Sequence, residues 1–413
     1  MIIVLKKSLR FIAVLTALLA ISISFFGCKS ASDEEDYYVS FSLPGTFYVN
    51  GTKLSGAELS GIRADISSIL HDTEKALRTD GDSDSSRIGD AAAGEVVKVG
   101  EDTRTLLSFS QKLYTETGGS FSPALYNLSD LWGFSPSFEG HYGDTRPEPS
   151  AEAIEEALRH SQLSDIQLTE DGVVKSDAQT RLDFGGIAKG YMCDLIIRYF
   201  REKYAGKALN GTFSVMSSGT VLLGEKIEGS GTRGYTASIE NPRRLTTQVN
   251  DVAFLTGLSD VILSTSADTY RFYAEDGKIY SHIIDPHTGR PSDNGVISIT
   301  IIMPLRVPYA GAVADAYSTA GFCMPLTEAL AFYESAAESL GIGAVVVTSD
   351  FRYYVLGDYN VLTRREYAQL VRPDLAEQTE DVFTRAEVSD ASDTVIPCAE
   401  EEEYISFVEE RAQ

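Results

Sequence analysis

Two hydrophobic patterns alternate along the chain, and each predicts a different secondary structure. Apolar residues that recur at intervals of three and four predict helices, and these occupy residues 62–77, 103–117, 150–160, 187–204 and 311–322. Short apolar runs bounded by turn residues predict strands, which occupy residues 212–216, 235–239, 252–255, 279–284, 296–303, 344–348 and 351–356. Because several neighbouring strands are joined by short turns, we expect antiparallel sheets with helices packed on them, which is an α+β domain.

The first residues, 1–28, have the layout of an export signal. A basic start precedes the apolar residues 11–26, a run that is short for a transmembrane helix. A glycine and then Cys28 end this run, and a polar tether follows at residues 29–40. The pattern is similar to a bacterial lipoprotein signal, in which Cys28 would be lipidated. The alternatives are an ordinary signal peptide with a chance cysteine, or a short anchor helix.

The last residues, 367–413, differ in character from the body of the chain at residues 41–366. From residue 372 onward the sequence is acidic and poor in core-forming patterns. Such a composition is typical of segments that stay in solvent. We therefore predict a solvated acidic tail, with a short helix at its end.

The chain is strongly acidic, and this excludes some partners. Its formal net charge is −25, and removal of residues 1–27, which hold three basic and no acidic residues, moves the charge to −28. A chain of this charge repels nucleic acid and anionic lipid headgroups, so we predict no nucleic-acid partner, and a phosphate-bearing ligand would need a metal. The other cysteines, Cys193, Cys323 and Cys398, are too widely spaced to predict a disulfide framework or a CxxC metal site.

The first segment with candidate chemistry, residues 182–195, reads LDFGGIAKGYMCDL. A double glycine opens the predicted helix, and a helix N-terminus with close backbone access suits a phosphate. Asp183 precedes the glycines, and Lys189 lies one turn into the helix, where its ammonium supplies a positive charge for the same group. The alternative is a strand-to-helix turn whose glycines only permit packing.

The second segment, residues 312–322, reads AVADAYSTAGF. Asp315 and Thr319 are four residues apart, so a helix places them on one face. A carboxylate and a hydroxyl in this arrangement are hard oxygen ligands that suit Mg²⁺. Two polar surface residues would be the alternative, but the alanines, valine and phenylalanine around them indicate a mostly buried helix. A buried aspartate needs a partner.

The third segment, residues 280–291, reads YSHIIDPHTGRP. A turn accounts for residues 285–289, because proline presets φ and glycine accepts a positive φ. It does not account for His282, which follows a predicted strand. A lone histidine is more often structural than catalytic, so this segment alone decides nothing.

Together the three segments resemble the ApbE family, the FAD:protein FMN transferases. The resemblance rests on DFGGIAKGY, STSADTYRFYAEDGKIYSHIIDPHTGRP and ADAYSTAG, in the order of that family, with looser matches at residues 43–49 and 115–134. It covers residues 43–362. It implies a T-fold-like α+β domain that is exported to the outer face of the bacterial cytoplasmic membrane, often as a lipoprotein. It also implies Mg²⁺-dependent cleavage of FAD, with FMN transferred to a Thr or Ser of an acceptor protein and AMP released.

The resemblance also implies roles for single residues. Mg²⁺ would be held by Asp315, Thr319 and the backbone carbonyl of Gly186. His282 would be the general base for the acceptor hydroxyl, a task that suits a group that titrates near neutrality. Asp285 would orient the imidazole of His282 or, as an equal alternative, only form an Asx-turn.

The FAD site implied by the resemblance draws on several loops. Its residues would be Asp183, Lys189, the Ile284 backbone, Ser120, Phe121 and Ser122. The chain departs from the usual family pattern in this same site, at Pro44, Thr79, Gly89, Ser122, Ser217 and Ser218. The departures leave two alternatives to flavin transfer, which are a Mg²⁺-dependent FAD pyrophosphatase and a lipid-anchored flavin-binding protein without turnover.

Overall fold

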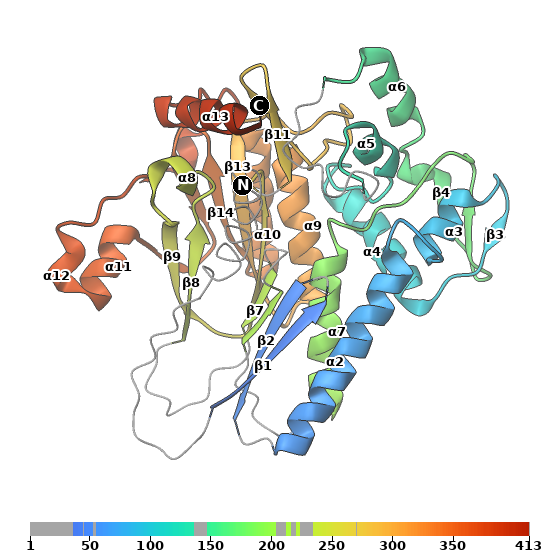
Figure 1. Cartoon of the computed structure of the whole chain (residues 1–413), viewed down its shortest axis with the longest axis horizontal. Helices are drawn as coiled ribbons and strands as arrows, with labels where there is room; N and C mark the ends of the chain where they lie inside the picture. Colours follow the sequence, from blue (N-terminus) through green and yellow to red (C-terminus); the bar gives the residue numbers. More distant parts are fainter. Residues whose placement is uncertain are drawn as a thin grey trace, which may run out of the picture. The chain divides into compact units, whose positions relative to one another are not determined.

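The computed structural model describes residues 36–43, 45–52, 55–135, 147–203, 212–215, 220–223, 234–269 and 271–412 (Figure 1). These residues belong to one unit of the chain. Four positions singled out in the sequence lie outside the described residues, namely Cys28, Pro44, Ser217 and Ser218. Among the residues that are described, no helix is both long and apolar enough to cross a membrane.

A nine-stranded sheet runs through the described part of the chain, in the order β1-β2-β6-β7-β10-β13-β14-β15-β17. Its strands are β1 (Asp36–Leu43), β2 (Gly45–Thr52), β6 (Thr212–Val215), β7 (Thr220–Leu223), β10 (Val261–Ala267), β13 (Val296–Pro304), β14 (Gly343–Thr348), β15 (Arg352–Leu356) and β17 (Thr384–Arg385). Neighbouring strands are antiparallel except for β15 and β17, which are parallel. The prediction of an α+β domain with antiparallel sheets is therefore confirmed.

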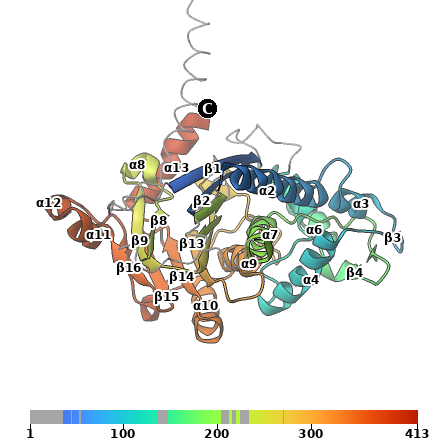
Figure 2. The same cartoon turned by 90° about the horizontal axis from the view of Figure 1, so that it is seen from below.

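The central strands are buried on both faces, which explains their continuous apolar sequences. In β14, Ala344 and Val346 belong to one hydrophobic cluster, whereas Val345 and Val347 belong to another. The second cluster also contains residues of a three-stranded sheet, formed by β8 (Tyr235–Glu240), β9 (Asp251–Leu258) and β16 (Asn360–Thr363). The large sheet thus lies between a helical layer and this smaller sheet (Figure 2).

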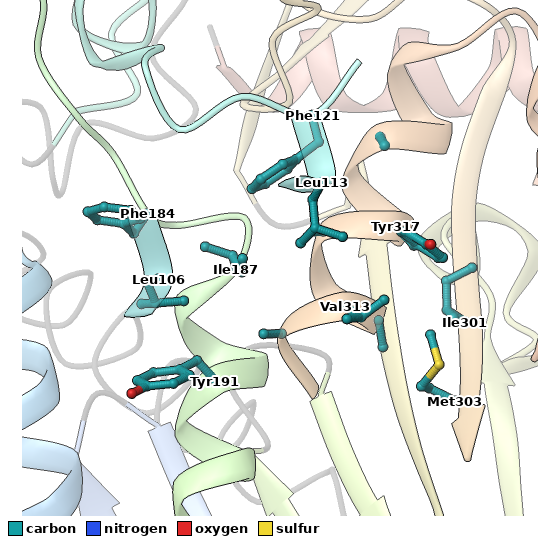
Figure 3. Close-up of a cluster of buried hydrophobic side chains, with 14 of the residues drawn as sticks. Leu106, Leu113, Phe121, Phe184, Ile187, Tyr191, Ile301, Met303, Val313 and Tyr317 are labelled. Atoms are coloured by element: carbon teal, nitrogen blue, oxygen red, sulfur yellow. The ribbon is translucent and has the colours of Figure 1, made fainter. Parts of the chain in front are cut away.

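The helical layer packs on the other face of the large sheet. Its main members are α2 (Gly56–Leu77), α4 (Glu101–Glu116), α7 (Ala188–Lys203), α9 (Ala310–Cys323) and α10 (Leu326–Leu340). Figure 3 shows Val313 and Tyr317 of α9 close to Ile301 and Met303 of β13, with Leu113 of α4 on the other side of α9. This cluster fixes α9 against the centre of the sheet.

Shorter elements complete the described structure. They are α3 (Asp84–Asp90), β3 (Val96–Val97), α5 (Tyr126–Leu131), α6 (Ala151–Arg159), a 3-10 turn (Leu163–Asp165), β4 (Ile166–Leu168), β5 (Val173–Lys175), α8 (Arg244–Thr247), β11 (Phe272–Glu275), β12 (Lys278–Ser281), α11 (Arg364–Val371), α12 (Pro373–Ala376), a second 3-10 turn (Val388–Asp390) and α13 (Ala399–Ala412). The hairpin β11–β12 forms a sheet of its own.

The predicted helices are present, and the bounds of one helix and one strand differ clearly from the prediction. Helix α2 begins at Gly56 rather than at residue 62, because Ser55 and Glu58 form a reciprocal capping box. Strand β12 ends at Ser281 rather than at residue 284, and Ile284 instead forms an isolated bridge with Pro291.

The prediction of a solvated C-terminal tail with a short helix at its end is only partly right: most residues from 372 to 400 are exposed and α13 is the expected helix, but the segment also packs on the fold. β17 extends the large sheet, and the ring of Phe383 stacks on Phe351 with centroids 4.5 Å apart. In α13, Glu401 and Tyr404 are 3% and 1% exposed. The acidic composition was misleading because the carboxylate of Glu401 faces a buried arginine, Arg243, rather than solvent.

Candidate active site

Helices α7 and α9 cross in backbone contact, and this crossing holds the candidate site together. A Cβ added at Gly190 would lie 1.9 Å from the carbonyl oxygen of Gly311, and one added at Gly311 would lie 2.1 Å from the carbonyl oxygen of Gly190. No side chain fits at such separations, so both positions require glycine. The close approach brings the first turn of α7 next to the first half of α9.

Asp194 of α7 caps the N-terminus of α9. Its carboxylate accepts hydrogen bonds from the backbone N–H groups of Gly311 (2.8 Å) and Ala312 (2.9 Å). The residue before α9, Tyr309, has a φ of 54° and provides no side-chain cap. Burial raises the pKa of Asp194 to about 7, whereas its two amide donors oppose that shift. Sequence reasoning missed this residue, although its position four residues after Gly190 places both on one face of α7.

We expect Asp194→Ala to lower the free energy of unfolding by about 1–3 kcal/mol, because two buried N–H groups at the start of α9 lose their acceptor. Asp194→Asn keeps one acceptor oxygen and should lose less. Urea unfolding followed by circular dichroism measures both, with Asp171→Ala at an exposed aspartate as the control. Equal stability of Asp194→Ala and Asp171→Ala would contradict the capping role.

Asp315 of α9 is a buried carboxylate, only 2% exposed. The apolar residues on either side of it in the sequence predicted this burial. Its oxygens lie 3.4 Å from Nζ of Lys189 and accept hydrogen bonds from the N–H of Gly190 (3.1 Å) and the hydroxyl of Ser264 in β10 (3.3 Å). A buried charge of this kind needs a cation or several donors to remain stable. In the structure, α7 provides the cation and one donor, and β10 provides a second donor.

The bond from Gly190 to Asp315 leaves the carbonyl of Gly186 available. The N–H of residue i in a helix usually donates to the carbonyl of residue i−4, but the N–H of Gly190 donates to Asp315 instead. Within the described residues, no hydrogen bond to the Gly186 carbonyl is found. A carbonyl left without a donor at the start of a buried helix is suited to bind a ligand.

Thr319 lies beside Gly186 and completes a set of oxygen ligands. A Cβ added at Gly186 would be 3.2 Å from Oγ1 of Thr319 and 3.5 Å from the ring of Phe121. The Thr319 hydroxyl donates to the carbonyl of Asp315 (3.1 Å) and lies 3.4 Å from Oγ of Ser266. One carboxylate, one hydroxyl and one carbonyl form a hard donor set that fits Mg²⁺. Where the structure describes the chain, it holds no cluster of three or more His, Cys, Asp or Glu that could bind a metal.

His282 follows β12 with its ring held in one orientation. Its N–H donates to the carbonyl of Arg271 (2.9 Å), and Nδ1 lies 3.2 Å from the same oxygen. Because a carbonyl can only accept, Nδ1 carries the proton and Nε2 keeps its lone pair. Burial and, to a smaller extent, the charges of Arg271 and Lys189 together lower the pKa of His282 to about 3. The imidazole is therefore neutral at pH 7 with a free lone pair on Nε2, but the expectation of a group that titrates near neutrality does not hold in the ligand-free protein.

Asp285 forms an Asx-turn and does not orient His282. Its Oδ1 accepts from the N–H of His287 (2.9 Å), and its Oδ2 accepts from the hydroxyl of Thr288 (2.9 Å). The turn ends at Gly289, which has a φ of 69°. Of the two alternatives for Asp285, the structure supports the turn.

The remaining predicted residues lie in loops around this centre. Phe121 packs beside Gly186. The Asp183 carboxylate accepts from the N–H of Gly185 (2.8 Å), and Oγ of Ser122 accepts from the N–H of Ala124 (3.2 Å). The carbonyl of Ile284 accepts from the thiol of Cys323 at the end of α9 (3.5 Å). Ser120 is buried in the same loop as Phe121, and no described contact joins Ser120 or Ser122 to Asp315.

Sequence comparison identifies the family. Residues 39–343 match the sequence model of the ApbE family. The chain belongs to the ApbE family. Among its curated relatives, the FAD:protein FMN transferase of Klebsiella pneumoniae is 26% identical over 275 residues, which is 65% of this chain and 74% of the relative. The FAD:protein FMN transferase of Treponema pallidum is 27% identical over 320 residues, which is 73% of this chain and 81% of the relative.

Solved structures of ApbE proteins share the fold. The flavinyl transferase ApbE of Pseudomonas stutzeri superposes with a TM-score of 0.64 at 24% identity, over 83% of this chain and 98% of that chain. The ApbE protein of Thermotoga maritima gives a TM-score of 0.63 at 26% identity, over 80% of this chain and 97% of that chain. The α+β architecture described above is thus the architecture of ApbE proteins.

Proposed function

We propose that this ApbE protein is a FAD:protein FMN transferase that acts on a Thr or Ser of an acceptor protein and releases AMP. One observation carries the proposal. The buried carboxylate of Asp315 binds the amide of Gly190 in α7, the hydroxyl of Thr319 in α9 lies beside Gly186, and the carbonyl of Gly186 has no donor among the described residues. A neutral histidine, His282, lies two residues before Ile284, whose carbonyl accepts a hydrogen bond from the thiol of Cys323 at the end of α9. Relatives named FAD:protein FMN transferase support the choice of reaction.

Gly186, Asp315 and Thr319 would hold Mg²⁺. Bound there, the ion would neutralise charge on the FAD pyrophosphate and favour AMP as the leaving group. Lys189 would pair with a phosphate oxygen, and the N-terminus of α7 would add the partial positive charge of its N–H groups. Asp183 holds the glycine turn in front of α7, which keeps the backbone open to the dinucleotide.

His282 would act as the general base. The acceptor hydroxyl oxygen attacks the phosphorus of the FMN phosphoryl group, while Nε2 of His282 accepts the hydroxyl proton. A new P–O bond forms to the acceptor, and the bond from phosphorus to the oxygen of AMP breaks. The carbonyl of Arg271 fixes the reactive tautomer throughout, because it accepts the Nδ1 proton.

Transfer, hydrolysis and simple binding are distinguished by one experiment. The chain from residue 29 onward is incubated with FAD and Mg²⁺, with and without a protein that carries a flavinylation motif, and AMP and covalent flavin are measured. Transfer predicts covalent flavin and AMP in equal amounts, and only with the acceptor. AMP at the same rate without acceptor would indicate a pyrophosphatase. Bound FAD without AMP in either case would indicate a flavin-binding protein.

We also propose that the chain is exported and lipid-anchored through Cys28 on the outer face of the bacterial cytoplasmic membrane. The support is the basic, apolar and small-residue order of residues 1–28. Cys28→Ser is expected to move the protein from the membrane fraction to the soluble fraction of a bacterial host, as seen by immunoblotting. A variant that stays with the membrane would favour a short anchor helix instead.

A further inference from the structure

The C-terminal helix α13 lies beyond the residues that match the family, which end at residue 343, yet it packs against the body of the fold. It contacts α8 and the strand β11, as Figure 1 also shows. The established features of the site do not account for this helix. Its contacts lead to the candidate site by two routes, one to the strand β10 and one to the hairpin that precedes His282.

The first route is a buried ion cluster. The guanidinium of Arg243 donates to both oxygens of Asp268 (2.8 and 2.7 Å) and to both oxygens of Glu401 in α13 (2.5 and 2.7 Å). Its Cζ also lies 4.5 Å from the ring centroid of Tyr404. Paired bidentate contacts of this kind are directional and strong when water is excluded. They tie α13 to Asp268.

Asp268 directly follows β10, the strand that lines the oxygen site. In β10, Ser264 donates to the carboxylate of Asp315, and Ser266 lies 2.8 Å from the hydroxyl of Ser318 and 3.4 Å from that of Thr319. The ion cluster is therefore continuous with the strand that supports the candidate metal ligands.

The second route is the hairpin that leads to His282. Oε1 of Glu409 in α13 accepts a hydrogen bond from the N–H of Gly277 (2.7 Å), in the turn between β11 and β12. The ring of Phe272 in β11 lies 6.4 Å from that of Tyr404. Arg271 precedes β11 and holds His282, which follows β12. Helix α13 thus contacts both the turn and the base of the hairpin whose ends fix the imidazole.

We infer that α13 is a clamp on the β11–β12 hairpin, and that Glu401 and Glu409 are positioning residues for His282. Glu401 acts indirectly, because its pairing with Arg243 anchors α13 in place, whereas Glu409 holds the hairpin directly through the Gly277 amide. The inference rests on the proposed function only in that His282 is the residue positioned. The clamp concerns the stability of the hairpin, which can be measured without an activity assay.

The test uses the full chain with the substitutions Glu409→Ala and Glu401→Gln. Glu410→Ala and Glu402→Gln, at exposed positions of the same helix, are the matched controls. Hydrogen exchange of the hairpin amides at residues 272–281 is measured in the ligand-free protein. Loss of one hydrogen bond should speed this exchange about tenfold, and Glu409→Gln, which keeps an acceptor oxygen, should restore slow exchange.

Turnover with acceptor provides the second measurement. Both clamp variants should lower kcat about tenfold. In Glu409→Ala the KM for FAD should stay unchanged, because the hairpin that holds the histidine moves and the nucleotide site does not. Exchange and kcat equal to those of Glu410→Ala and Glu402→Gln would overturn the clamp. Faster exchange in a protein that shows no transfer even with its native sequence would support the clamp and refute the proposed function.

Discussion

Asp315→Ala is expected to reduce AMP release from FAD by roughly 10³-fold or more, because metal-assisted charge stabilisation contributes several kcal/mol. Asp315 is the only carboxylate in the set formed with Gly186 and Thr319, and its removal leaves two uncharged oxygens for a divalent cation. AMP release is measured with a coupled assay. Binding of Mg²⁺ to the ligand-free protein is measured by calorimetry and should be lost in parallel.

Two further variants separate this effect from a loss of fold. Asp315→Asn keeps the size of the side chain and an acceptor for the Gly190 amide, so it should retain the near-ultraviolet circular dichroism spectrum yet remain inactive. Asp102→Ala removes a carboxylate that accepts from the Tyr191 hydroxyl of α7 (2.7 Å) but lies outside the oxygen set, and it should stay active. Unchanged turnover in Asp315→Ala, or in native protein treated with EDTA, would show that the metal assignment is wrong.

His282→Ala is expected to lower turnover with acceptor by about 10²–10⁴-fold, which is the usual contribution of a general base. The affinity for FAD should hardly change, because Nε2 serves the acceptor hydroxyl and not the nucleotide. Stopped-flow measurement of covalent flavin gives the first quantity, and quenching of flavin fluorescence gives the second.

A histidine in the same segment provides the control. His287 is exposed, and its backbone belongs to the Asx-turn of Asp285, so His287→Ala should leave turnover within about twofold of the native value, as expected for a surface substitution. If His282→Ala lost FAD affinity to the same degree as turnover, His282 would be a nucleotide contact or a structural residue instead. Nuclear magnetic resonance of the ring offers an independent check, since a pKa of about 3 means no titration between pH 8 and 5 in the ligand-free protein.

The local part of the site could be predicted from the sequence. The spacing of Asp315 and Thr319 placed them on one helical face, and the apolar residues around them indicated burial. Both expectations hold because helical periodicity is a property of consecutive residues. The same is true of the Asp285 turn, where proline, threonine and glycine together specify the backbone.

The contacts between distant segments could not be predicted in this way. The capping of α9 by Asp194 depends on how closely α7 approaches α9. Gly190 and Gly311 permit this approach, but glycines at these positions do not by themselves predict it. The C-terminal segment shows the same limit. Glu401 looks like one acidic residue among several, and only the fold brings it to Arg243, 158 residues earlier in the chain. Composition reports the average environment of a segment and not the partner of a single side chain.

The crossing of α7 and α9 also has a consequence for the order of events during maturation. The amide of Gly190 and the carboxylate of Asp315 are separated by 125 residues, so the oxygen site does not exist in any fragment that lacks either helix. Contacts between residues this distant in sequence form late, because the entropy cost of closing a long loop precedes the favourable energy of the contact. Binding of Mg²⁺ should therefore appear only with the last phase of refolding, and a chain that ends before α9 would be unable to form the oxygen site.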